Sequence, residues 1–144
     1  MDIINQTTLP AIVDSLPKVM EFLDGILEGV DCPMKDQMAL DVALEEIYVN
    51  VASYAYPDEN KDGKGMVKII VAIKNVDEGC EITFIDQGIP YNPLKREDPD
   101  ITLSAEERDI GGLGIYMVKK SMDSVNYSYE EGSNIFTIYK KFSR

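Results

Sequence analysis

Apolar residues recur at helical spacing in some stretches of the chain and alternate with polar residues in others. The helical spacing predicts a helix that ends near Gly29, a longer helix from about residue 33 to Tyr56, and a further helix after Gly114. Asp31 stands where it would cap the longer helix. Alternation predicts β-strands at residues 2–7, 67–74, 80–85, 124–129 and 135–142.

The order of these elements predicts an α+β fold. Hairpins combined with a few helices indicate a two-layer α/β sandwich, in which the helices cover one face of a mixed, mostly antiparallel sheet. The length of 144 residues suits one domain, so we assign residues 1–144 to a single domain. From Ile89 to Asp109 the pattern dissolves into prolines and charges, which indicates an irregular loop.

Composition argues against several classes of protein. No apolar run approaches the ~20 residues of a membrane helix and the N-terminus lacks a secretory signal, so we expect a cytoplasmic protein without a membrane partner. The net charge of −12 argues against direct nucleic-acid binding. Because the sequence has no histidine, it cannot form a catalytic triad or a phosphohistidine. Cys32 and Cys80 are expected to be free thiols.

The longer helix carries a carboxylate and an amide one turn apart. Glu46 and Asn50 are four residues apart, so their side chains emerge on the same face. One interpretation is that Glu46 points to water, as most helix glutamates do. The other makes Asn50 an oxygen ligand for Mg²⁺ and Glu46 a base beside it.

A second polar group stands at the end of a strand. Asp86 and Gly88 follow the apolar strand that ends at Ile85. Asp86 is either a turn former or an acceptor for the exocyclic amine of a base, with Gly88 leaving room for the ring. In the second case an acceptor selects adenine, because guanine presents an acceptor at the corresponding edge.

A third feature is the run Gly111-Gly112-Leu113-Gly114 at the start of a helical pattern. Free N–H groups and the helix dipole make such a start a potential phosphate cradle. Glycines also occur in any tight loop, so this motif alone leaves both interpretations open.

Taken together and in this order, the motifs resemble those of the GHKL ATPase superfamily, whose nucleotide-binding domain is called the Bergerat fold. Glu46-x-x-x-Asn50 is similar to the N box, and Asp86-x-Gly88 and Gly112-x-Gly114 are similar to its two glycine boxes. Within the superfamily, the short length and the Gly-Gly-Leu-Gly run resemble the bacterial anti-sigma-factor serine/threonine kinases. The resemblance covers essentially the whole chain.

The resemblance implies ATP and Mg²⁺ as cofactors and a role for each motif residue. Asn50 would ligate Mg²⁺, Asp86 and Gly88 would hold adenine, and Glu46 would be the general base. The remaining nucleotide contacts that it implies are Arg108, Gly112, Leu113, Gly114 and Thr137. It places an ATP lid at about residues 91–110. Arg108 is open to a second interpretation as an ordinary surface arginine.

The implied activity is that of a protein serine kinase. It would transfer the γ-phosphate of ATP to a serine of an anti-anti-sigma partner of the STAS type, and it would sequester a sigma factor or a similar regulator. The family also leads us to expect a homodimer. The alternative is a nucleotide-gated module that binds a partner without phosphorylating it, and the presence of Glu46 favours the kinase.

Two positions depart from the family pattern. Pro90 stands where many relatives have a second glycine after the first glycine box, so the contacts of that loop with the base are in question. Tyr54 stands where relatives often have histidine, which argues against a functional role at this position, and the simple alternative is a buried tyrosine ring that packs on the sheet.

Overall fold

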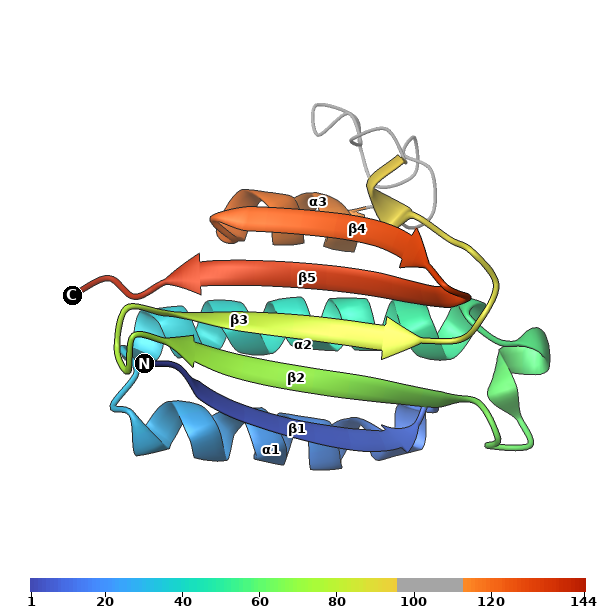
Figure 1. Cartoon of the computed structure of the whole chain (residues 1–144), viewed down its shortest axis with the longest axis horizontal. Coiled ribbons are helices and arrows are strands. Elements are labelled where there is room, and N and C mark those ends of the chain that lie inside the picture. Colours follow the sequence, from blue (N-terminus) through green and yellow to red (C-terminus); the bar gives the residue numbers. More distant parts are fainter. Residues whose placement is uncertain (96–112) are drawn as a thin grey trace.

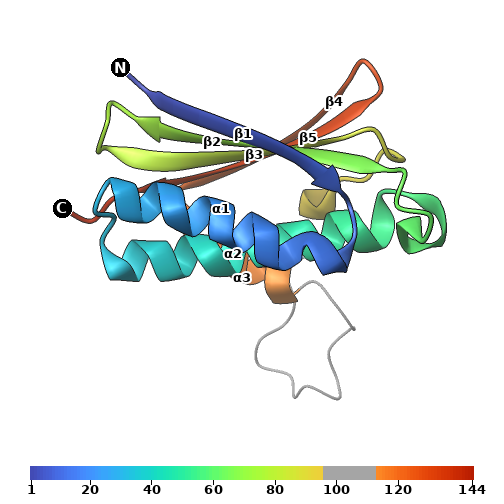
Figure 2. The same ribbon diagram turned by 90° about the horizontal axis from the view of Figure 1, so that it is seen from below.

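The computed structural model describes residues 1–95 and 113–144, which form a two-layer sandwich (Figure 1). One layer is a five-stranded sheet in the order β1-β2-β3-β5-β4. Its strands are β1 (Ile3–Pro10), β2 (Met66–Lys74), β3 (Gly79–Asp86), β4 (Ser124–Glu130) and β5 (Ser133–Lys141). The other layer contains α1 (Leu16–Gly29), α2 (Met34–Tyr54) and α3 (Leu113–Ser121), all on one face of the sheet (Figure 2). The predicted two-layer α+β fold is therefore confirmed.

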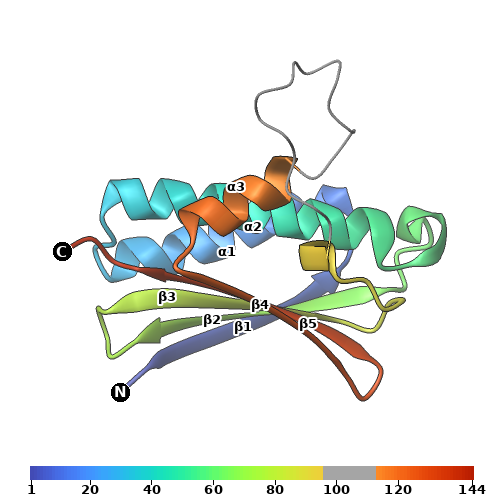
Figure 3. The ribbon, with the colours of Figure 1, turned by 90° about the horizontal axis from the view of Figure 1, so that it is seen from above.

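The sheet is more regular than the mixed sheet expected from the sequence, because all four strand pairings in the described chain are antiparallel. The reason lies in the connection between β1 and β2. The chain leaves β1, crosses the helix layer along α1 and returns along α2 before it enters β2 (Figure 3). The chain reverses direction three times on this path, between β1 and α1, between α1 and α2 and between α2 and β2, so β2 runs opposite to β1.

The core lies between the layers and fixes how α2 is rotated on the sheet. Fully buried leucines of α1 and α2 pack on β-branched and aromatic residues of the central strands. Tyr48 of α2 is also fully buried, and its hydroxyl lies 2.9 Å from the carbonyl oxygens of both Pro10 and Ile12. This contact ties the middle of α2 to the end of β1, so the opposite side of the helix, with Glu46 and Asn50, is left for other contacts.

The start of α2 differs from the sequence expectation. Pro33 is the residue before the first turn, and no side chain caps the helix. Asp31 instead adopts a positive φ of 53° and belongs to the turn that ends α1, where its N–H donates to the Glu28 carbonyl oxygen. Its own carbonyl oxygen accepts a hydrogen bond from the Arg144 guanidinium at 2.6 Å. Asp31 therefore closes the first helix and does not cap the second.

Between α1 and α2 two carboxyl groups face each other, and this contact makes stability depend on pH. Burial, followed by the hydrogen bond and charge of Asp24, raises the pKa of Asp41 from 3.8 to about 7. The folded protein thus holds this proton more tightly than the unfolded chain, and the associated stability is lost as pH rises from about 4 to about 7. We expect Asp41→Asn to stabilise the protein relative to wild type at pH 8 but much less at pH 4.5.

Urea denaturation of both proteins at the two pH values measures this difference. Asp77→Asn, in the exposed turn between β2 and β3, is the matched control and is expected to show no such change. An equal effect of Asp41→Asn at both pH values would contradict the raised pKa of Asp41.

None of the helices in the described ranges is both long enough and apolar enough to cross a membrane.

Candidate functional site

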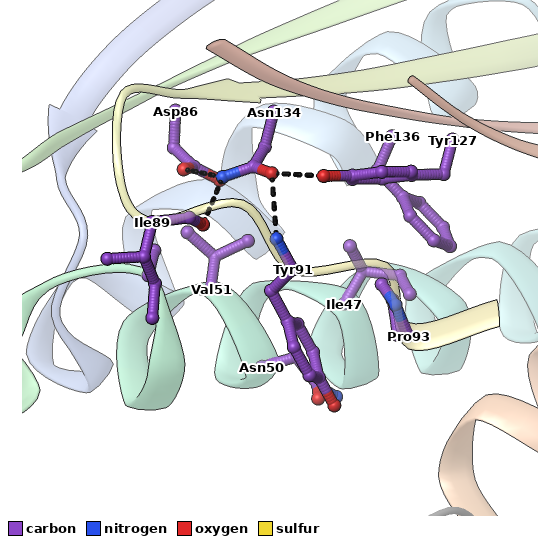
Figure 4. A pocket seen from close by; sticks show the side chains of 11 residues that line it. Ile47, Asn50, Val51, Asp86, Ile89, Tyr91, Pro93, Tyr127, Asn134 and Phe136 are labelled. Carbon is purple, nitrogen blue, oxygen red and sulfur yellow. Dashed lines mark hydrogen bonds between the residues drawn. The ribbon is translucent and has the colours of Figure 1, made fainter. Parts of the chain in front are cut away.

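A pocket opens where α2 passes the ends of β3 and β5 (Figure 4). It contains about 390 Å³ of space not filled by protein atoms, open solvent included. Its walls are mostly apolar, with three amide or carboxylate side chains among them. The lining residues are Ile47, Asn50, Val51, Ala55, Asp86, Ile89, Tyr91, Pro93, Tyr127, Asn134 and Phe136.

Asp86 is the buried acid of this pocket. It is the last residue of β3, and the period of two along the strand turns it to the same face as Phe84, toward the helices. Its side chain is almost fully enclosed. The carboxylate oxygen Oδ1 accepts hydrogen bonds from the Gly88 N–H and from Asn134 Nδ2, both at 2.9 Å. Burial raises the pKa of Asp86, and these two hydrogen bonds act in the opposite direction.

Gly88 lets the loop after β3 pack directly on the end of α2. A Cβ atom at this position would lie 2.1 Å from the carbonyl oxygen of Ala55, which is buried backbone. The same oxygen accepts a hydrogen bond from the Ile89 N–H at 2.8 Å. Pro90 fits here without loss, because the residues on either side of it supply the hydrogen bonds of the loop.

Asn134 is a pocket residue that the sequence analysis did not identify. It is the direct cross-strand partner of Asp86 in the β3–β5 pairing. Its Nδ2 donates to Asp86 and to the Ile89 carbonyl oxygen at 2.8 Å, and its Oδ1 accepts from the Tyr91 N–H at 3.2 Å and from the Tyr127 hydroxyl. Figure 4 shows this hydrogen-bond network at one end of the pocket. The Asn134 side chain therefore connects β3 and β5 to the loop that follows β3.

Thr137, by contrast, does not reach the pocket. It lies on the opposite face of β5 from Asn134 and Phe136, the two residues of this strand that line the pocket. Its hydroxyl oxygen is 3.3 Å from that of Thr83, its cross-strand partner on β3. Residues 134 and 137 differ in parity and cannot share a strand face, so only one of the two could face the helices.

Glu46 and Asn50 lie together on the side of α2 that faces α3, as their spacing predicts. Glu46 is partly buried, whereas its neighbour Glu45 is exposed. Asn50 Nδ2 donates to the Glu46 carbonyl oxygen at 2.8 Å, and the Asn50 side chain lines the pocket. A Cβ atom on Gly114 would lie 1.9 Å from Oε2 of Glu46. The carboxylate therefore rests against the first turn of α3, where the helix dipole favours negative charge.

The remaining expectations have different outcomes. Tyr54 is 56% exposed and its ring lies 5.7 Å from that of Tyr91, so the interpretation of Tyr54 as a buried ring on the sheet is wrong. Arg108 and Gly112 lie outside the described residues. Leu113 begins α3. Only residues 91–95 of the expected lid fall within the described part of the chain.

The fold and the site together define a class of protein. A sheet covered on one face by helices, with a carboxylate at a strand end and a Glu-Asn pair facing a glycine-led helix, has the architecture of a histidine kinase-like ATPase. Residues 9–140 match the family described as the Histidine kinase-like ATPase domain, and the chain belongs to this family. Membership implies that the protein binds ATP.

The named relatives have low sequence identity to this chain, and they carry the same name. The chain is 24% identical over 131 residues to the serine-protein kinase RsbW of Bacillus cereus, covering 88% of this chain and 78% of that one. It is 27% identical over 100 residues to RsbW of Listeria monocytogenes, covering 67% and 60%.

A solved structure supports the fold. It contains the RsbU and RsbW domains of a Mycobacterium tuberculosis protein and superposes with a TM-score of 0.65 at 16% identity. The match covers 99% of the present chain and 33% of the solved one, so our chain spans about a third of that protein's length. This likeness concerns the fold alone.

Proposed function

We propose that this protein is a Mg²⁺-dependent protein serine kinase that transfers the γ-phosphate of ATP to a partner protein. The observation that carries the proposal is the position of Glu46. Its carboxylate lies against the start of α3 and one turn from Asn50, beside a pocket with a buried acid. The names of the relatives, serine-protein kinases, support the same reaction.

The residues that line the pocket match the chemistry of an adenine base. Ile47, Val51 and Phe136 provide apolar walls for a flat ring, and the acceptor Asp86 lies at the inner end. An ionised carboxylate accepts hydrogen bonds and donates none, so it pairs with the amino group of adenine and not with the carbonyl of guanine. Gly88 keeps the loop close to α2, which shapes this end of the pocket.

The neighbouring groups fit phosphates and a magnesium ion. Asn50 offers an amide oxygen at the mouth of the pocket, the type of ligand that Mg²⁺ accepts alongside phosphate oxygens. The first turn of α3, which begins at Leu113, would offer its free N–H groups to phosphate oxygens. Gly112, Leu113 and Arg108 complete the proposed phosphate contacts. When bound, Mg²⁺ would neutralise phosphate charge during transfer.

Glu46 is the proposed general base. It would accept the proton of the partner's serine hydroxyl while the hydroxyl oxygen forms its bond to the γ-phosphorus and the bond to the leaving oxygen of ADP breaks. The carboxylate already lies beside the start of α3 before a partner binds. Positioning and charge neutralisation provide most of the catalysis in such reactions, and the base contributes the remainder.

The proposed partner is an anti-anti-sigma protein of the STAS type, and we propose that the kinase also sequesters a sigma factor or a similar regulator, as a homodimer. The basis is the similarity to RsbW over most of the chain. The second candidate function is a nucleotide-gated module that binds its partner without phosphorylating it. It would need Asn50 and the glycines but has no use for Glu46 beside α3.

Calorimetric titration with ADP, with and without Mg²⁺, tests the nucleotide site. We expect Mg²⁺ to strengthen binding, and we expect Asn50→Ala to reduce the affinity in Mg²⁺ about tenfold or more, because the variant lacks a metal ligand. Without Mg²⁺ the variant and the wild type should differ little. Asn126→Ala, at an exposed position on β4, is the matched control. A wild-type protein that binds no nucleotide at millimolar concentration would contradict both candidate functions.

A further inference from the structure

The amide of Asn134 has one possible orientation, because backbone groups fix both of its ends. The Tyr91 N–H is a donor and requires the oxygen Oδ1, whereas the Ile89 carbonyl is an acceptor and requires the nitrogen Nδ2. Exchanging oxygen and nitrogen would set donor against donor at one end and acceptor against acceptor at the other. Nδ2 must therefore face Asp86, to which it donates at 2.9 Å.

This orientation determines what Asp86 presents to a ligand. Its Oδ1 already accepts from two donors, Asn134 Nδ2 and the Gly88 N–H. Within residues 1–95 and 113–144, no group donates a hydrogen bond to the other oxygen, Oδ2. Oδ2 is thus the atom that meets a base, and it is also the only place where a proton can reside.

We propose that Asn134 is a positioning residue that sets the preference of the pocket for adenine over guanine, by holding Asp86 as a hydrogen-bond acceptor. The inference rests on the proposed nucleotide-binding function. An ionised Asp86 accepts from the amino group of adenine. A protonated Asp86 donates from Oδ2 and pairs instead with the carbonyl of guanine. The charge on one carboxyl group therefore decides which base is bound.

Asn134 acts against the burial of this group. Burial raises the pKa of Asp86, and the Asn134 hydrogen bond is the larger of the two contributions that lower it, ahead of the Gly88 N–H. Without the amide, the pKa of Asp86 moves upward and its neutral form extends to higher pH.

Two other titratable groups interact with the charge of Asp86. They are Tyr56, which follows α2, and Tyr127 on β4. Burial raises the pKa of each phenol above its ordinary value of 10.0, so both stay neutral near and below neutral pH. Neither hydroxyl donates to Asp86, because that of Tyr56 donates to the Met66 carbonyl oxygen and that of Tyr127 donates to Asn134 Oδ1, so neither takes the place of the amide.

The test uses Asn134→Leu, which has a similar volume and no donor, with Asn126→Ala as the control on the neighbouring strand. A ¹³C NMR titration of the nucleotide-free protein follows the Asp86 carboxyl, assigned by its loss in Asp86→Asn. We expect the titration midpoint to move up by about one pH unit or more in Asn134→Leu. The midpoint in Asn126→Ala should equal that of wild type.

The second readout is the ratio of the dissociation constants for GDP and ADP near neutral pH. We expect the ratio to fall about tenfold or more in Asn134→Leu, because well above the pKa a rise of one pKa unit increases the protonated fraction of Asp86 about tenfold, and the protonated form is the one that pairs with guanine. If Asn134→Leu does not fold, Asn134→Ala removes the same donor without added bulk and replaces it in both measurements.

The outcomes separate this inference from the function on which it rests. If an Asn134 variant binds ADP and GDP more weakly by the same factor and the Asp86 midpoint is unchanged, Asn134 is only structural and the inference is wrong. If the wild-type protein binds neither nucleotide, the proposed function fails, and the inference fails with it.

Discussion

Glu46→Gln is expected to reduce phosphoryl transfer by about 10²–10⁴-fold while ADP binding changes only a few-fold. The substituted amide keeps the size of the side chain and its place beside Gly114, but it cannot accept the proton of the serine hydroxyl. The measurement is intact-mass detection of phosphate on a purified STAS-type protein under single-turnover conditions, together with calorimetric titration of ADP. Loss of transfer with retained binding separates the kinase from the nucleotide-gated module.

A neighbouring residue on α2 provides the matched control for this experiment. Glu45 precedes Glu46 and is exposed to solvent, so Glu45→Gln makes the same chemical change one position away and should leave transfer unaffected. Transfer by Glu46→Gln at the wild-type rate would contradict the assigned base. A wild-type protein that binds ADP but transfers no phosphate to any STAS-type partner would favour the nucleotide-gated module.

Gly88→Ala is expected to lower the free energy of unfolding by about 3 kcal/mol. The new methyl group would lie 2.1 Å from the Ala55 carbonyl oxygen, and both are held by backbone, so no side-chain rotation relieves the overlap. Separating them breaks the 2.8 Å hydrogen bond from the Ile89 N–H to Ala55 and moves the loop that carries Tyr91. Urea denaturation measures the loss of stability.

Gly25→Ala is the matched control for this prediction. Gly25 lies within α1, and no atom is within 4 Å of the position that its Cβ would take. The same substitution should therefore stabilise the protein by up to about 1 kcal/mol, because alanine is the better helix former. A similar small effect at both glycines would show that the close approach of residue 88 to α2 is not a constraint.

Local patterns in the sequence were sufficient to predict most elements of the fold. Alternation located each strand and helical spacing located the helices, because each pattern reflects which side chains face the core. The cap at Asp31 was wrong for a different reason. A capping residue is defined by its backbone conformation, and the positive φ of Asp31 follows from how α1 turns into α2.

The site was predicted in part. Glu46 and Asn50 could be paired because helix geometry fixes residues one turn apart. Asp86 could be singled out by its place at the end of an apolar strand, but the strand pattern alone left open whether it forms a turn or meets a base. Asn134 was missed in favour of Thr137. Both faces of β5 carry apolar residues, so the alternation in the sequence does not show which face packs on the helices. Only the pairing of β5 with β3 decides between them.

That pairing also bears on the order in which the protein folds. The β2–β3 and β4–β5 hairpins each join strands that are neighbours in sequence, whereas β3 and β5 join residues such as Asp86 and Asn134 that are 48 positions apart. Contacts of such long range are slow to form, because a large loop must close first. Asp86 on β3 and Asn134 on β5 therefore meet only when the two hairpins come together. The pocket that these residues line, and with it the capacity to bind nucleotide, arises late in folding.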